Sequence, residues 1–365
     1  MGKILNVIEK HSGGKCFYSN RYTLDNIIPP EYQDKEEEFK SDKVFETENP
    51  SGKNILLKFD QPAQSLFSYF LDGSRRTYKI ADFASNDNKY LPIVAGQIGT
   101  AVTYRKNKKL KKYKLIKKNV LAIPDRLGGE YETIRDEIKK IKTHNLTIDE
   151  ILKYQYRPNP DRPFENLAIA KIQVEMLDME VQLISAMVHS NKLHPDKMLI
   201  IDGSLQFSSV KEENVHIFTN VIGISKTFNP HLQDILKTKK KEIGHHLANL
   251  KFGERTAVYK YEPEGKRRQT IKIGAWYLRI REKKYSKNPL DGVIKIEKVA
   301  TTSDEKEDGF DTYQIDEISR AVLLERNVTC YGNDIRWANH LYPVYLTEFL
   351  IKNSFVSEQY FLNIF

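Results

Sequence analysis

The distribution of apolar and polar residues predicts strands over much of the first third of the chain. Apolar-rich segments at 65–71, 78–83, 91–104 and 113–123 are separated by polar residues and turn formers, a pattern that favours an antiparallel sheet. An Asn-Lys-Lys sequence lies between the last two segments. We expect it to form the tip of a long, basic antiparallel hairpin.

A helical period replaces this pattern over residues 164–189. Apolar residues recur there at spacings of three or four, which predicts a long amphipathic helix. Because successive residues lie about 100° apart around a helix, Glu180 falls within the apolar stripe and Glu175 at its margin. The helix carries no lysine or arginine after Lys171. Glu180 is therefore either a residue at the edge of the core or a ligand for a cation.

The remaining elements complete a mixture of strands and helices. Strands are predicted at 198–201, 214–225 and within 255–299, and helices at 232–252, 315–326 and 345–353. Residues 1–60 are polar, and we expect a peripheral segment that binds a partner. No repeat or long flexible linker divides residues 61–365, which we assign to one α/β domain with a mixed sheet and flanking helices.

Two Asp-Gly-Ser sequences follow apolar runs, at 72–74 and 202–204. Each alone is also a common hairpin turn. A carboxylate at the end of a buried strand is destabilising unless a cation or a hydrogen-bond donor meets it. Asp72 and Asp202, joined by Glu180, would offer the hard oxygen ligands that Mg²⁺ or Mn²⁺ prefers. Lys226, after an apolar run, would orient a phosphate or lie solvated at a strand end.

The charge of the chain favours a polyanionic partner. The formal net charge is +9, and the basic residues gather in clusters near Tyr104, Tyr113 and Trp276. Cations beside aromatic rings are typical of nucleic-acid binding, although a solvated hairpin tip has the same composition. The candidate DNA-binding residues are Arg105, Lys108, Lys109, Lys111, Lys112, Lys114, Lys239, Lys240, Arg267 and Arg268.

Several classes of protein are not indicated by the sequence. The chain has two cysteines, Cys16 and Cys330, too few for a disulfide framework. It has no secretory signal and no run of about 18 apolar residues, so we expect a cytoplasmic protein with no membrane association. A phosphate-binding loop, a zinc-protease motif and a serine-hydrolase elbow are also missing. ATP-driven movement would therefore require a separate motor protein.

Five short motifs resemble, in order, those of the NurA nuclease family, whose members act with the hexameric DNA translocase HerA. They are Phe70 to Ser74, Met179 to Ile184, Leu199 to Leu205, Val221 to Lys226, and a closing segment with Arg336-Trp337 and Leu341 to Leu346. The resemblance spans about residues 65–350. It implies an RNase H-like core and a DNA nuclease that depends on two Mn²⁺ or Mg²⁺ ions.

The resemblance also assigns roles to residues. Asp72, Glu180 and Asp202 become metal ligands, and Lys226 becomes a phosphate or structural contact. A further polar metal-site residue is expected after the proline segment, where Phe349 or Leu350 stands in this chain. The nearest polar substitutes are His340 and Glu348, and Glu175 is a further candidate.

The family resemblance implies partners as well as a reaction. It implies a homodimer whose active sites face a DNA channel and dock onto a HerA-type ATPase, in DNA end processing or antiviral defence. Two other functions fit the same residues. Another RNase H-like nuclease, of the Argonaute or transposase type, would use the same carboxylates. A non-catalytic DNA-binding adaptor of a translocase would retain them as structural remnants.

Overall fold

A computed structural model describes residues 2–19, 23–24, 43–58, 65–127, 131–143, 145–156, 163–207, 209–236, 241–261, 271–326 and 335–365. Within these residues, twelve strands form one mixed sheet in the order β2-β9-β11-β12-β8-β7-β3-β4-β5-β6, with β1 paired to β3 and β10 to β11. The strands are β1 (Lys15–Tyr18), β2 (Ile55–Leu56), β3 (Phe67–Ala84), β4 (Tyr90–Lys106), β5 (Lys109–Pro124), β6 (Glu150–Tyr154), β7 (Met198–Asp202), β8 (Val221–Ser225), β9 (Glu254–Arg255), β10 (Tyr259–Tyr261), β11 (Ile273–Arg279) and β12 (Val293–Val299). The protein is therefore an α/β protein, as the sequence predicts.

Helices pack on both faces of this sheet. They are α1 (Lys3–Ser12), α3 (Tyr131–Lys140), α4 (Phe164–His189), α5 (Ile243–Ala248), α6 (Ser303–Glu307), α7 (Thr312–Leu324), α8 (Tyr342–Ser354) and α9 (Glu358–Leu362), with 3-10 turns η1 (Glu212–Phe218), η2 (Lys283–Tyr285) and η3 (Ile335–Asn339). The helix predicted over residues 164–189 is confirmed as α4. Among the described residues, no helix has the length and apolar content needed to cross a membrane.

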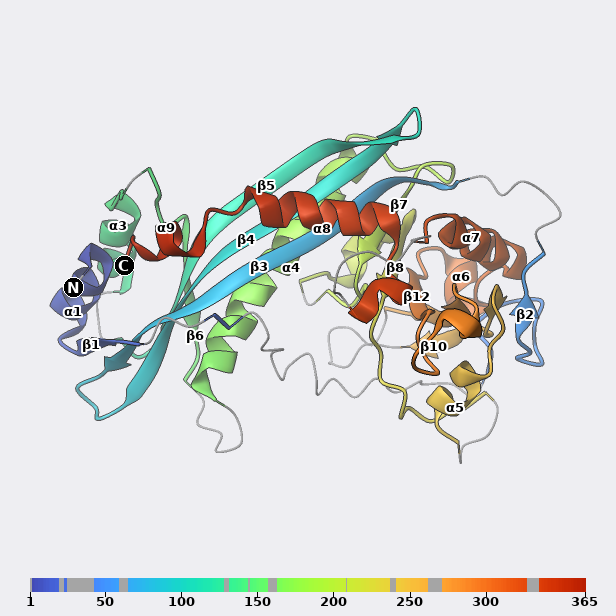
Figure 1. The fold of residues 1–365 in the computed structure, drawn as a ribbon, viewed down its shortest axis with the longest axis horizontal. Helices are drawn as coiled ribbons and strands as arrows, with labels where there is room; N and C mark the ends of the chain where they lie inside the picture. Colours follow the sequence, from blue (N-terminus) through green and yellow to red (C-terminus); the bar gives the residue numbers. More distant parts are fainter. Residues whose placement is uncertain are drawn as a thin grey trace.

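The three longest strands, β3, β4 and β5, form an antiparallel meander that extends over much of the length of the molecule (Figure 1). The β4–β5 turn has only two residues, Asn107 and Lys108, both with positive φ, as a tight hairpin turn requires. Our sequence interpretation that a strand ends at residue 71 is wrong. Asp72-Gly73-Ser74 lies inside β3, because β4 pairs with these residues without interruption, as in Asp72↔Ala101.

Two parallel strands continue the sheet beside β3. β7 runs parallel to β3, with Leu71 opposite Ile201, and β8 runs parallel to β7. Both are short and end at Asp202 and Ser225. Their carboxyl ends therefore lie level with the Asp-Gly-Ser sequence of β3.

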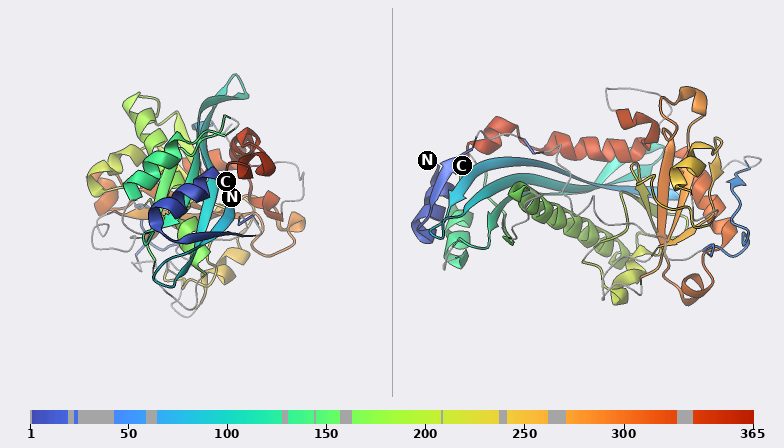
Figure 2. Two further views of the ribbon diagram at one scale, coloured as in Figure 1. Left: turned by 90° about the vertical axis from the view of Figure 1, so that its left-hand side faces the viewer. Right: turned by 90° about the horizontal axis from the view of Figure 1, so that it is seen from below.

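The helices α4 and α8 cover opposite faces of the meander (Figure 2, right). Gly73 of β3 faces Glu180 and Met176 of α4. On the other face, Thr103 of β4 lies 2.6 Å from the hydroxyl of Thr347 of α8. Because side chains alternate along a strand, Asp72 points toward α8 and Gly73 toward α4.

Parts of the first sixty residues contribute to two separate regions of the core. Ile4 and Leu5 of α1 pack with Phe361 of α9, so the two termini lie side by side. Phe45 and Leu57 pack with residues of β11, β12 and α7. The domain boundary at residue 60 and its partner-binding role stay predictions.

Two predicted elements differ from the structure. The strand predicted over 214–225 begins only at Val221, since residues 212–218 form η1. Of the helix predicted over 232–252, the described residues 232–236 and 241–252 form a helix only as α5. The buried Asp234 carboxylate accepts hydrogen bonds from the Tyr259 hydroxyl and His246 Nδ1, and these contacts hold Asp234 and the described residues beside it in a turn.

Candidate metal centre

Three carboxylates from distant parts of the chain meet on the α8 side of the sheet. Asp72 comes from β3, Asp202 from the end of β7 and Glu348 from α8, and one ligand atom from each lies within 4.8 Å of the others. Gly203 has a φ of 118° and turns the chain away directly after Asp202. Such a group of hard oxygen atoms matches the ligands of Mg²⁺ and Mn²⁺.

Asp72 is buried without enough hydrogen-bond donors. Its Oδ1 accepts a hydrogen bond from the Gly73 N–H at 2.9 Å, whereas its Oδ2 is buried and accepts no hydrogen bond from the described residues. Burial raises the pKa of Asp72 well above its usual range, and the charge of Asp202 raises it further, while Lys226 opposes both. A bound cation would supply the missing partner of Oδ2, so the residues fit a metal ion.

Lys226 neutralises only part of the negative charge. Its Nζ lies 2.5 Å from Asp202 Oδ2. Burial alone would lower the pKa of Lys226, but the charges of Asp202 and Asp72 together raise it above its ordinary value, so the ammonium stays protonated. When all are ionised, three carboxylates face one ammonium, and the remaining two negative charges match a divalent cation.

Glu180 approaches the same region from α4. A Cβ placed on Gly73 would lie 2.0 Å from Glu180 Oε1, so this carboxylate occupies the space that any larger residue would need. Burial raises the pKa of Glu180 well above its usual range, and the charge of Asp202 adds to this effect. Glu180 is thus coupled electrostatically to Asp202 from the opposite side of β3.

The other candidate ligands differ in position. Glu175 forms an ion pair with Lys118 at 2.6 Å, and His340 packs against the ring of Tyr345. Neither belongs to the group of three carboxylates. Glu348 does, and the sequence contained a signal for it. It lies four residues after Val344 and three before Ile351, both buried, on the inner face of α8.

Sequence reasoning missed the residues that hold the turn after Asp202. Glu297 of β12 is buried, and its Oε2 accepts hydrogen bonds from Ser204 Oγ and the Leu205 N–H, both at 2.8 Å. Lys295 Nζ lies 2.9 Å from the other oxygen, Oε1. All seven residues of β12 are buried, three charged ones among them, Lys295, Glu297 and Lys298. These charges within an apolar strand are the only signal of a special role that the sequence offers.

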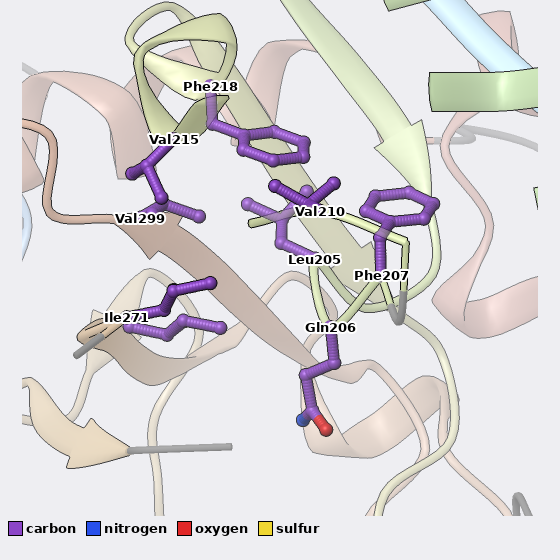
Figure 3. A pocket seen from close by; sticks show the side chains of 9 residues that line it. Leu205, Gln206, Phe207, Val210, Val215, Phe218, Ile271 and Val299 are labelled. Atoms are coloured by element: carbon purple, nitrogen blue, oxygen red, sulfur yellow. The ribbon is translucent and has the colours of Figure 1, made fainter. Parts of the chain in front are cut away.

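An apolar cluster fixes the same turn from the other side (Figure 3). Leu205 and Phe207 pack there with Phe218, whose ring stacks on that of Phe207 at 5.7 Å. Gln206 points away from these rings and accepts a hydrogen bond from the Tyr261 hydroxyl. The cavity between these side chains, of about 10 Å³, is no larger than one water molecule needs. The cluster therefore anchors the turn and has no room for a ligand.

The candidate DNA-binding residues fall into three groups. Lys108, Lys109, Lys111, Lys112 and Lys114 lie at the hairpin tip and along β5, and all are exposed. Arg105 instead pairs with Glu325, with Nη1 2.8 Å from Oε1. Lys239, Lys240, Arg267 and Arg268 lie outside the described residues.

We expect Asp72→Asn to stabilise the protein when metal is absent. Since the folded-state pKa of Asp72 is raised, the wild type loses stability relative to the variant as the pH rises above about 4 and through that pKa. At pH 7 the variant should be more stable by about 1–3 kcal/mol. Urea unfolding in EDTA at pH 4 and pH 7 measures this difference. A wild type as stable as the variant at pH 7 would argue against an unsatisfied buried charge.

We expect Gly73→Ala to displace the Glu180 carboxylate, because the added methyl would overlap its oxygen. Binding of Mn²⁺, measured by calorimetry, should weaken by about 10- to 100-fold, as when groups that support metal ligands are lost. Gly96→Ala is the matched control, since its methyl would also face α4 but at 3.4 Å from Ile172. Equal Mn²⁺ affinities of the two variants would show that Glu180 does not contribute to metal binding.

No family model matches the chain, and no curated protein matches it. Among solved structures, the chain is similar to the NurA nuclease from Sulfolobus solfataricus, with 13% sequence identity, 78% of each chain covered and a TM-score of 0.43. The family named from the sequence motifs is the same one.

Proposed function

We propose that the chain is a divalent-metal-dependent nuclease that hydrolyses phosphodiester bonds in DNA. The observation that carries the proposal is the meeting of Asp72, Asp202 and Glu348 around a buried carboxylate oxygen that lacks a donor. A metal site of this kind within a chain of net charge +9 favours a polyanionic substrate.

The order of the central strands supports an RNase H-like core. Among the central strands, the antiparallel β3, β4 and β5 come first along the chain, and the parallel strands β7 and β8 follow after α4. In the sheet their order is β5-β4-β3-β7-β8. This arrangement puts an aspartate of the first strand beside one at the end of the fourth.

The residues of the candidate metal centre would have distinct roles. Asp72, Asp202 and Glu348 would hold Mn²⁺ or Mg²⁺, and Glu180 would contribute to a second ion. Bound divalent ions supply Lewis-acid stabilisation and an activated water for phosphodiester hydrolysis. Lys226 stays protonated beside Asp202, where it orients that carboxylate and offers positive charge to a substrate phosphate.

The test is an incubation of the purified chain with linear single-stranded and duplex DNA, with Mn²⁺, Mg²⁺ or EDTA. We expect degradation with either metal and none with EDTA. Glu175→Gln is a suitable control, because Glu175 pairs with Lys118 outside the carboxylate group and its loss should leave cleavage intact. Cleavage that persists in EDTA would refute metal dependence.

The partners form a further part of the proposal. The resemblance to the NurA family supports a homodimer that acts in the cytoplasm with a HerA-type hexameric ATPase, in DNA end processing or antiviral defence. The chain has no phosphate-binding loop of its own, so translocation would depend on such a motor. Adding the ATPase and ATP should increase degradation of duplex DNA.

Simultaneous replacement of Lys108, Lys109, Lys111 and Lys112 by alanine should weaken DNA binding and flatten its salt dependence. Each lysine that leaves a phosphate contact removes about 0.7 to 0.9 from the slope of log affinity against log salt. Fluorescence anisotropy at several salt concentrations measures the slope. An unchanged slope would show that these lysines lie outside the DNA path.

A further inference from the structure

Three tyrosines from neighbouring strands meet near the tip of the β4–β5 hairpin. Tyr69 of β3 lies opposite Tyr104 of β4, and Tyr113 of β5 contacts both. The ring of Tyr113 is 5.7 Å from that of Tyr69 and 6.4 Å from that of Tyr104, in edge-to-face geometry. Tyr113 remains 37% exposed, so this tyrosine cluster presents an aromatic ring to solvent.

A β-bulge in β5 places two lysines beside the tyrosine cluster. Lys114 pairs with Val102 and Lys112 pairs with Thr103, which leaves Tyr113 as the extra residue of β5. Lys111 pairs with Tyr104. Val102 and Tyr104, two residues apart along β4, point to the same face of the sheet, and paired residues on neighbouring strands share a face. Their partners Lys114 and Lys111 therefore lie on the same face as the ring of Tyr104 and flank the tyrosines. A bulge of this kind redirects side chains, and here it puts two ammonium groups beside one exposed ring.

The charge on this hairpin is not compensated. No aspartate or glutamate occurs from residue 88 to residue 124. Arg105 and Lys118 reach carboxylates of other elements. By contrast, no described carboxylate forms an ion pair with Lys106, Lys108, Lys109, Lys111, Lys112 or Lys114. Lys117 Nζ donates a hydrogen bond to the backbone oxygen of Ser354. The hairpin projects from the body of the protein (Figure 1), where it is accessible to a large polyanion.

The aromatic ring distinguishes between two explanations for these lysines. Lysines on an edge strand can serve simply to prevent pairing with another sheet, a role that needs no tyrosine. Phosphates of duplex and single-stranded DNA are both accessible to lysines, but only unpaired bases can stack on a protein ring. An exposed ring between two lysines therefore matches a single strand better than a duplex.

We infer that the hairpin binds a single-stranded segment of DNA, with one base stacked on Tyr113 and adjacent phosphates at Lys111 and Lys114. This inference rests on the proposed function, and it specifies the form of the substrate. Tyr69 precedes Asp72 by three residues, about 10 Å along β3, and points to the other face. The tyrosine cluster thus holds a part of the strand beyond the bond that is cut.

The inference is tested by equilibrium binding of the full chain in EDTA, where metal-dependent cleavage cannot interfere. The probes are a fluorescein-labelled 20-nucleotide oligothymidylate and a labelled 20-base-pair duplex. We expect Tyr113→Ala to weaken binding of the single strand by about 5- to 100-fold, the loss of one stacked base, and binding of the duplex by less than about twofold. Tyr113→Phe, which keeps a ring, should bind both probes like the wild type.

Tyr285→Ala is the matched control, since Tyr285 is also exposed and has the ammonium of Lys284 at 4.9 Å from its ring. It should leave both affinities unchanged, and thermal melts should confirm that all variants fold. Unchanged single-strand binding by Tyr113→Ala would overturn the inference, and so would an equal loss for the duplex. A chain that shows the Tyr113 effect but never cuts DNA would refute the nuclease proposal alone.

Discussion

Asp202→Asn should reduce DNA cleavage by more than about 100-fold while the fold and the DNA affinity remain. Groups that merely support metal ligands already change activity by about 10- to 100-fold when replaced, and Asp202 belongs to the carboxylate group itself. The asparagine has the same shape but no charge to offer a cation. Lys226 would still have the charges of Asp72 and Glu348 beside it, so the buried ammonium remains compensated.

The measurement compares initial rates of degradation of a labelled linear DNA in Mn²⁺ for the wild type, Asp202→Asn and Glu175→Gln. Cleavage by Asp202→Asn at a tenth of the normal rate would remove Asp202 from the metal centre. A wild type that binds DNA but shows no cleavage, even with a translocase present, would favour the adaptor interpretation. In that case the carboxylates would be structural remnants.

Local sequence patterns predicted those elements whose periodicity is strong. The apolar repeat of α4 over 26 residues is set within the helix itself, so its bounds followed from the sequence. The continuity of β3 did not, because Asp-Gly is a turn signal in isolation. Asp72 pairs with Ala101 of β4, and the preceding Leu71 pairs with Ile201 of β7, so this part of β3 stays extended. Neither contact is visible from nearby residues.

The metal centre, too, could be predicted from the sequence only where local patterns mark its residues. Asp72, Glu180 and Asp202 could be proposed because each is a carboxylate in a strongly apolar segment. Glu348 joins them only because α8 returns across β3 near the end of the chain. Arg105 shows the reverse case, since its charge indicated DNA binding until Glu325, far along the chain, proved to be its partner.

Arg255→Met should destabilise the protein by about 3–5 kcal/mol, the usual effect of removing one partner of a buried ion pair. Arg255 is fully buried, with Nη2 2.9 Å from Glu46 Oε2 and Nε 2.6 Å from Asp316 Oδ1. Methionine fills much of the space, but the Glu46 carboxylate, whose side chain is also fully buried, would lose its countercharge. Urea unfolding at pH 7 measures the change.

A double-mutant cycle separates the charge from the packing. Glu46→Gln combined with Arg255→Met removes both charges, so the double variant should be more stable than Arg255→Met alone. The Glu46 side chain also accepts a hydrogen bond from Asn49 Nδ2 at 2.9 Å, which a glutamine oxygen can retain. If the double variant is no more stable than Arg255→Met, the destabilisation comes from lost packing. If the double variant is more stable than Arg255→Met, the ion pair stabilises the packing of residues near Glu46 against β9 and α7.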